Sequence, residues 1–383
     1  MRKICVVITA RPSYSRIRSA LEALRDREDI ELQVVAAASA LLDRYGSVVD
    51  EIERDGFEIA SRVYMVLEGE QPSTMAKTTG IGMIELATAL DNLQPDFVVT
   101  IADRHETLAT AVAAAYMNIP LVHIQGGEIT GSIDEKVRHA ITKLADYHLV
   151  STAQAGERVV RMGEEPDTVV VTGCPSIDIA AGVLDHPAPD FDPMAKYGGV
   201  GAKLDLSGRY LVVLQHPVTT EHDLARRHVQ ETLHAVAESG IPTLWFWPNA
   251  DAGSDGTSRG IRAFRETHNP ANVHFFKNMA PTDFLRVVHR AGCLVGNSSA
   301  GIREGSFLGV PVVNIGVRQA GRDRGANVLD VGYDRQGITD AIQKQVAHGR
   351  YPSDSLYGDG AAGPRIAGAL ARIEPRIHKR LNY

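Results

Sequence analysis

Acidic side chains follow two apolar runs in the first half of the chain, in a pattern suited to acid–base chemistry. Asp103 comes directly after the run FVVTI, and Glu128 follows the run PLVHI in the segment HIQGGE. Asp134 and Glu135 come a few residues later. Carboxylates gathered at neighbouring strand ends raise one another's pKa, so that one is protonated while another is ionised. Such a cluster predicts proton abstraction or elimination.

Each of these residues also has a simpler interpretation. Asp103 could cap a helix that begins near Glu106. Arg138 lies four residues after Asp134, so the two could form a surface ion pair on one face of a helix. His123 and His139 lack the Cys/His spacing typical of a metal site. We therefore expect hydrogen-bonding or core histidines, and no metal.

Small polar residues and arginines in the second half predict an anion site. After the run CLVG the chain reads NSSAGIRE, which places Ser298, Ser299 and Gly301 at a turn into a helix. Hydroxyls and exposed N–H groups at such a turn bind phosphate, although the GK[ST] element of a Walker loop is missing. Glu304, one turn further on, could accept both hydroxyls of a ribose. A serine-capped helix start is the simpler alternative.

Other candidates also follow apolar runs. Arg11 and Arg16 come after the first run, where two guanidinium groups at a helix start would suit a diphosphate; a capped helix start with one solvated arginine is the alternative. His216 follows RYLVVL and could act as a general acid or phosphate contact. The remaining candidates supply positive charge or polar contacts for a nucleotide sugar: Arg318, Arg322 and Asn249.

Strands and helices must alternate to bring these positions together. In the first half, β-branched runs predict strands over 3–9, 31–37, 96–101, 120–124 and 147–151. Amphipathic segments between them predict helices over 14–25, 81–93, 106–116 and 134–144. Repeated alternation indicates a parallel, doubly wound sheet with helices on both faces. The polar stretch 68–80 is expected to be a loop.

Prolines and glycines over 173–205 indicate a connection between domains. Strands are then predicted over 209–214, 242–247, 272–276, 293–295 and 311–315, and a last helix over 365–381, kinked at Pro375. We predict an α/β protein with two Rossmann-like doubly wound domains facing a cleft. The predicted parts are an N-terminal domain over 1–175, a C-terminal domain over 176–363, and a C-terminal helix over 364–383 that can pack back on the N-terminal domain.

Composition narrows the class of protein. Among 383 residues, 40 are basic and 47 acidic, so the net charge of −7 argues against a nucleic-acid partner. Three cysteines are too few to stabilise a secreted protein of this size with disulfide bonds. The N-terminus also has no signal-peptide cleavage site, so a cytoplasmic location is expected. No apolar run approaches the roughly 20 residues of a membrane helix.

The motifs together resemble the UDP-N-acetylglucosamine 2-epimerase family, most closely its hydrolysing, sialic-acid-pathway branch. The resemblance rests on the segments TARPSYSR, ADRHET, HIQGGEITGSIDEKVRHAITKLADYH, GCPSID, QHPVTTE, WPNADAGSDG, GNSSAGIREG and NIGVRQAGR. These run in family order from about residue 3 to residue 325. The family has the glycosyltransferase B fold, in agreement with the predicted alternation.

The resemblance implies a two-step reaction without a cofactor. A carboxylate removes the proton at sugar C2 while UDP leaves C1, and water then adds to the 2-acetamidoglucal to give N-acetylmannosamine. Asp103 corresponds to the family's aspartate after the fourth strand, Asp134 to the acidic residue that opens the helix, and His216 to the histidine of the second domain. Arg11 matches an N-terminal arginine near the diphosphate. Ser298, Ser299 and Gly301 correspond to the diphosphate turn and Glu304 to the ribose-binding glutamate. We also expect a homo-oligomer, either a dimer or a tetramer.

Gln125 departs from the family pattern. Many members carry a catalytic glutamate at this position, and an amide cannot act as a general base. Glu128 could take over, or the chemistry could rest on Asp103 and Asp134. Alternatives that stay open are a non-hydrolysing epimerase, a related substrate such as UDP-N,N′-diacetylbacillosamine, a glycosyltransferase, and a non-catalytic UDP-sugar binding protein.

Overall fold

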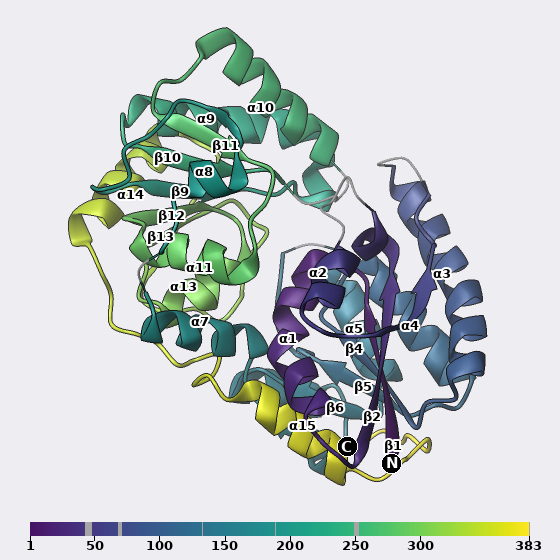
Figure 1. Cartoon of the computed structure of the whole chain (residues 1–383). Helices are drawn as coiled ribbons and strands as arrows, with labels where there is room; N and C mark the ends of the chain where they lie inside the picture. The colour runs from purple at the N-terminus through teal and green to yellow at the C-terminus, as the bar shows by residue number, and fades with distance from the viewer. Residues whose placement is uncertain (43–47, 68–70, 132, 188, 249–252, 383) are drawn as a thin grey trace. The chain divides into compact units, whose positions relative to one another are not determined.

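The computed structural model describes residues 1–42, 48–67, 71–131, 133–187, 189–248 and 253–382. The chain divides into two compact units (Figure 1). The first contains Met1–Glu128, Ile133–Asp178 and Tyr357–Tyr383, and the second contains Ile129–Ser132 and Ile179–Leu356. Each unit holds a mostly parallel sheet, which confirms the predicted α/β fold with two doubly wound halves.

The first unit is built on a fully parallel sheet in the order β3-β2-β1-β4-β5-β6-β7. Its strands are β1 (Arg2–Ile8), β2 (Ile30–Ala37), β3 (Ile59–Val63), β4 (Phe97–Ile101), β5 (Leu121–Ile124), β6 (Tyr147–Val150) and β7 (Val169–Val171). Its helices are α1 (Arg11–Arg25), α2 (Val48–Arg54), α3 (Pro72–Leu93), α4 (His105–Tyr116), α5 (Asp134–Leu144), α6 (Ala153–Arg161), the first part of α7 (Pro175–Asp185), and α15 (Ala362–Arg372).

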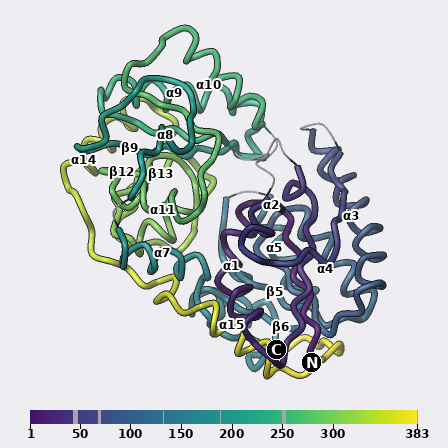
Figure 2. Tube along the Cα trace, viewed as in Figure 1, coloured from purple at the N-terminus to yellow at the C-terminus, as the bar shows by residue number. Residues whose placement is uncertain are grey.

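Helices cover both faces of this sheet because successive side chains of a strand point to opposite faces. Ile4, Val6 and Ile8 of β1 share a core with α1 and α15. Cys5 and Val7 share the other core with α3 and α4. Figure 2 shows α15, at the yellow end of the trace, beside α1 at the purple end. The two ends of the sequence therefore belong to one folded unit.

The second unit repeats this topology in the order β14-β13-β12-β9-β10-β11-β8. All of its strand pairs are parallel except β8 with β11. Its strands are β8 (Val200–Gly201), β9 (Leu211–Leu214), β10 (Thr243–Phe246), β11 (Val273–Phe276), β12 (Cys293–Gly296), β13 (Val312–Ile315) and β14 (Val328–Val331). Its helices are the rest of α7, α8 (Pro193–Tyr197), α9 (Ala225–Glu238), α10 (Ser254–His268), α11 (Pro281–Arg290), α12 (Ser299–Ile302), α13 (Glu304–Phe307) and α14 (Arg335–His348).

Three segments differ from the sequence prediction. Helix α3 begins at Pro72, so most of the predicted loop over 68–80 is helical; residues 68–70 lie outside the described residues. Proline at the first helical position needs no N–H partner, and the buried Thr78 hydroxyl accepts from the Leu67 amide at 3.1 Å. Helix α15 ends at Arg372, before Pro375, and the chain beyond it is not helical. The predicted connection over 173–205 contains α7.

Each sheet has one point where the strand order reverses, between β1 and β4 in the first unit and between β9 and β12 in the second. Loops leaving the carboxyl ends of the two strands diverge there, and ligands of doubly wound sheets bind in the resulting crevice. Asp103 follows β4, whereas His216 and Ser298 follow β9 and β12. The topology therefore places these predicted site residues where such sheets bind ligands.

Candidate active site

The chain turns sharply at Asp103, and a buried histidine holds that turn. Ala102 has φ +66°, which L-residues rarely adopt. The carbonyl of Ala102 can only accept, so His123 Nε2 donates to it at 2.9 Å, and Nδ1 then accepts from the Thr142 hydroxyl at 3.1 Å. Burial lowers the pKa of His123 to about 3, which keeps the ring neutral. His123 is thus the hydrogen-bonding core histidine that the sequence predicts.

Arg138 is the centre of the acidic cluster. It is 1% exposed, and it forms an ion pair with the Asp103 carboxylate. It also contacts Glu135 at 3.0 Å and donates to the Glu128 carbonyl at 2.6 Å. Burial disfavours its charge, but attraction by Asp103 and Glu128 outweighs burial and raises the pKa of Arg138. Arg138 is therefore not the surface cation considered as an alternative, and its buried charge offsets the repulsion among the carboxylates.

The segment ADRHE separates into two charge groups. Glu106, 2% exposed, pairs with Arg104 at 3.0 Å and with His105 at 3.1 Å. Burial opposes its ionisation, but Arg104 and His105 outweigh burial and lower the pKa of Glu106. Arg104 occupies the N-cap position of α4, so the alternative that Asp103 is the N-cap is wrong. Arg104 and His105 therefore pair with Glu106, whereas Asp103 pairs with Arg138.

The Gln-Gly-Gly-Glu turn after β5 packs against Cys174 and the start of α6. Gln125 is 1% exposed with φ +67°, and its Nε2 donates to the Cys174 sulfur at 2.9 Å. Gly127 has φ +73°, and a Cβ atom there would lie 2.1 Å from the Ala155 carbonyl oxygen. The glycine is needed to fit the start of α6. Glu128, which follows it, is 2% exposed.

The remaining candidates of the first unit lie on two helix starts. Arg11 is the first residue of α1, and its Nη2 lies 3.6 Å from Glu51. Ala10 holds the N-cap position without a side-chain cap, so the capped-helix alternative is not what this helix uses. Arg16 lies in the second turn of α1 and is half-buried. Asp134 opens α5 and is also half-buried.

In the second unit, Asn297 joins the loops that follow three strands. Its Oδ1 accepts from the His216 amide at 2.7 Å, and its Nδ2 donates to the His216 carbonyl at 2.8 Å. Its own carbonyl accepts from Arg318 at 3.3 Å and from Gln319 at 2.9 Å. Asn297 is fully buried. The structure therefore brings His216, the NSS turn and Arg318 together.

The NSS turn caps a helix, and Glu304 lies one turn beyond it. Ser298 accepts from the Ala300 amide at 3.3 Å, as the simpler alternative predicts. Gly301 allows close packing, since a Cβ atom there would lie 2.9 Å from Val312. The chain bends at Arg303, so Glu304 opens the separate helix α13. Among the described residues, Glu304 Oε2 is buried with no hydrogen-bond partner.

Two of the predicted ligand contacts remain, Arg322 and Asn249. Arg322, 4% exposed, donates from Nε to the Ile129 carbonyl at 3.2 Å, a backbone contact that the sequence did not suggest. Asn249 lies outside the described residues.

Residues that the sequence prediction missed act through backbone or buried contacts. Asn297 lies within the quoted motif GNSSAGIREG, but the motif drew attention to its serines. Cys174, in the motif GCPSID, holds Gln125 and also contacts the Ser176 hydroxyl at 3.0 Å. A polar residue directly after an apolar strand was the signal available for Asn297, and no comparable signal marks Cys174.

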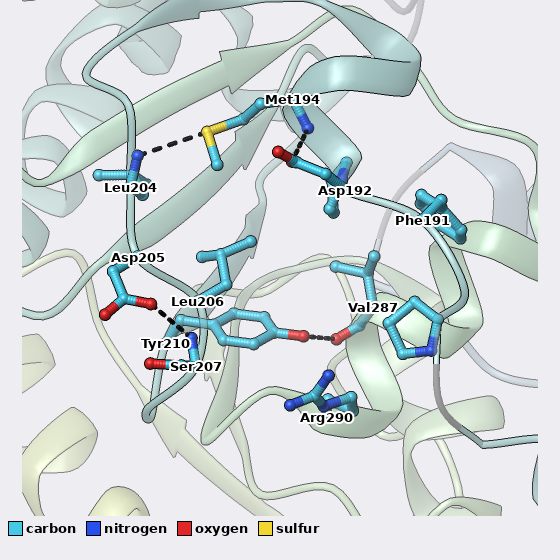
Figure 3. A pocket seen from close by; sticks show the side chains of 12 residues that line it. Phe191, Asp192, Met194, Leu204, Asp205, Leu206, Ser207, Tyr210, Val287 and Arg290 are labelled. Carbon is cyan, nitrogen blue, oxygen red and sulfur yellow. Dashed lines mark hydrogen bonds between the residues drawn. The ribbon is translucent and has the colours of Figure 1, made fainter.

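A hollow of about 370 Å³ in the second unit is lined by Phe191, Met194, Leu206, Tyr210 and Arg290 among others (Figure 3). Tyr210 comes just before β9, and its hydroxyl donates to the Val287 carbonyl at 2.6 Å. Arg290 ends α11, just before β12. The hollow therefore lies at the amino ends of these strands, away from the loops that carry His216 and Asn297.

Two Rossmann-like units, one with buried carboxylates and the other with hydroxyl and arginine groups after its strands, give the chain a glycosyltransferase B-like fold. A UDP-N-acetylglucosamine 2-epimerase from Neisseria meningitidis, solved bound to UDP-GlcNAc, has the same fold. Its TM-score is 0.79 at 17% identity, and the match covers 97% of this chain and 100% of that chain.

The chain belongs to the UDP-N-acetylglucosamine 2-epimerase family, whose sequence profile matches residues 22–371. It is 32% identical to a UDP-N,N′-diacetylbacillosamine 2-epimerase (hydrolyzing) from Legionella pneumophila, over 97% of this chain and 96% of the relative. It is 28% identical to a UDP-N-acetylglucosamine 2-epimerase from N. meningitidis, over 94% and 92% of the two chains. The resemblance noted in the sequence is thereby confirmed.

Across the described ranges, no helix combines the length and the apolar character needed to cross a membrane.

Proposed function

We propose that the chain is a hydrolysing 2-epimerase of a UDP-2-acetamido sugar. A carboxylate takes the C2 proton as the C1–O bond to UDP breaks, which leaves a 2-acetamidoglucal and UDP. Water then adds its oxygen to C1 and a proton reaches C2 from the opposite face. The products are UDP and a free 2-acetamido sugar with inverted C2. Both steps are redox-neutral, so the proposal needs no redox cofactor.

The carboxylate cluster around Arg138 carries this proposal. Arg138 contacts the Asp103 and Glu135 carboxylates and the Glu128 backbone within one buried group. We assign the acid–base steps to Asp103, Glu128 and Asp134, because the neutral amide of Gln125 cannot act as a general base and is engaged by Cys174. Arg138 and Glu135 would fix the carboxylates that contact the sugar.

The second unit would hold UDP. The unpartnered Glu304 Oε2 is an acceptor suited to the ribose hydroxyls. Ser298, Ser299 and Gly301 would form the turn for the diphosphate, with positive charge from Arg11, Arg16 and Arg318. His216, fixed through Asn297, would protonate or contact the leaving phosphate. Asn249 remains a proposed polar contact to the nucleotide sugar.

Two substrates should be compared. The Legionella relative is named for UDP-N,N′-diacetylbacillosamine and the Neisseria relative for UDP-N-acetylglucosamine. The purified chain would be incubated with each UDP-sugar in D₂O, and UDP and sugar would be followed by NMR. The proposal expects UDP release together with a free 2-epimeric sugar that carries deuterium at C2. Deuterium in a UDP-linked epimer would instead indicate the non-hydrolysing reaction.

Asp103→Asn is the matched variant for this test. It keeps the size of the side chain but cannot accept the C2 proton, so turnover should be abolished while UDP still binds. UDP binding without turnover by the native chain on either sugar would contradict the proposal and favour a binding protein. UDP release that requires an added acceptor would favour a glycosyltransferase. Sedimentation would measure the expected dimer or tetramer.

A further inference from the structure

Two arginines hold the successive carbonyl groups of Glu128 and Ile129. The Glu128 carbonyl accepts from Arg138 at 2.6 Å, and the Ile129 carbonyl accepts from Arg322 at 3.2 Å. Both guanidinium groups are at least 96% buried. Glu128 belongs to the first unit, whereas residues 129–132 belong to the second. The chain therefore passes from one unit to the other directly after a proposed catalytic carboxylate.

Gly131 fits this crossing segment, which we define as residues 129–131, against the loop after β13. Its amide donates to the Arg318 carbonyl at 3.1 Å. A Cβ atom on Gly131 would lie 1.9 Å from the Val317 carbonyl oxygen, which is backbone and cannot move aside cheaply. The backbone of Gly131 is not in the left-handed region, so this contact alone demands glycine.

The loop after β13, residues 316–324, is itself braced. Arg324 donates to the Gln319 and Arg322 carbonyls, the latter at 3.0 Å, and forms an ion pair with Asp330. On its other side the loop contacts the Asn297 carbonyl through Arg318 and Gln319. One rigid loop thus contacts the residue that fixes His216 and the segment that follows Glu128.

We propose that Gly131 and Arg322 are positioning residues for the acid–base chemistry. Anchoring the crossing segment on the loop after β13 fixes Ile129, and Ile129 restrains the Glu128 backbone through the peptide bond that joins the two residues. The inference rests on the proposed epimerase function and assigns Arg322 to the protein backbone rather than to the diphosphate.

Gly131→Ala tests the anchor directly. The methyl group should displace the crossing segment, and a misplacement of about 1 Å can reduce the rate about a hundred-fold. We expect kcat for UDP release to fall by about ten- to a hundred-fold, with UDP affinity measured by calorimetry unchanged. Hydrogen exchange at the amides of 126–131 should become faster. Gly182→Ala is the control, because Gly182 lies in α7 with nothing near its Cβ position.

Arg322→Lys separates positioning from phosphate binding. Lysine keeps the charge but cannot reproduce the Nε contact to Ile129, so kcat should fall and UDP affinity should hold. A fall in UDP affinity with unchanged kcat would make Arg322 a diphosphate ligand and overturn its positioning role.

If the Gly131→Ala variant had the same kcat and the same amide hydrogen-exchange rates as the native chain, the proposed anchoring of the crossing segment would be wrong. If the native chain turned over neither UDP-sugar, the proposed function would fail separately, since the exchange comparison needs no turnover.

Discussion

His216 and Asn297 are joined by two hydrogen bonds between the side-chain amide of one and the backbone of the other. The His216 amide donates to Asn297 Oδ1 at 2.7 Å, and Asn297 Nδ2 donates to the His216 carbonyl at 2.8 Å. The pair closes the gap between the loops after β9 and β12, the two strands at the topological switch point of the second sheet. His216 is thereby held by a residue 81 positions away in the sequence.

Asn297→Asp should reduce activity more than its cost in stability explains. The aspartate keeps the acceptor but replaces the donor by an oxygen that repels the His216 carbonyl. We expect a loss of about 1–3 kcal/mol in the free energy of unfolding and a fall in kcat. Asn272→Asp is the control, because Asn272 Nδ2 donates to the Val236 and Ile241 carbonyls at the opposite end of the sheet. Equal losses of kcat in the two variants would contradict this role for Asn297.

Arg138→Met should leave Asp103 buried without its counter-charge. Removing one partner of a buried ion pair costs about 3–5 kcal/mol, which urea unfolding would measure. The double variant with Asp103→Asn should be less destabilised than the sum of the two single variants, because it no longer leaves the Asp103 carboxylate without Arg138. Additive losses would show that the two side chains do not depend on each other.

Glu164 should give the first unit an acid-sensitive anchor for its C-terminal segment. Burial opposes its ionisation, but hydrogen bonds from His148, Lys143 and Lys379 outweigh burial and lower the pKa of Glu164 to about 2. A carboxyl with a depressed folded pKa stabilises the protein above its unfolded pKa of 4.5. The contribution, about 3 kcal/mol at neutral pH, should be lost as the pH falls from 4.5 towards 2.

Glu164→Gln measures this contribution as the difference in unfolding free energy from the native chain at several pH values. The difference should be largest near pH 7 and should shrink below pH 4.5. Glu165→Gln is the control, since Glu165 pairs with Arg376 in a half-exposed site, where a pair contributes at most about 1 kcal/mol. A difference that stayed constant down to pH 2 would rule out ionised Glu164 as the cause.

The central strands of both units follow from the sequence, as do helices α1, α4 and α5 of the first unit. Runs such as FVVTI and RYLVVL are continuous because parallel strands are buried on both faces, and this burial leaves a direct pattern in the residues. Edge elements were harder to predict, because β3 and β7 carry exposed or half-exposed residues, and such patterns resemble loops. The polar stretch over 68–80 was predicted as a loop, whereas helix α3 begins at Pro72.

For the candidate site, the sequence by itself determined which residue types follow the strands: Asp103, Glu128, His216 and the NSS turn. It could not decide their partners. Only the tertiary structure placed Arg138 between carboxylates from different segments, and Arg322 on the Ile129 carbonyl. The physical reason is that residues close together in the sequence determine where a strand ends. An ion pair or a backbone contact instead depends on which loops the sheet order brings together.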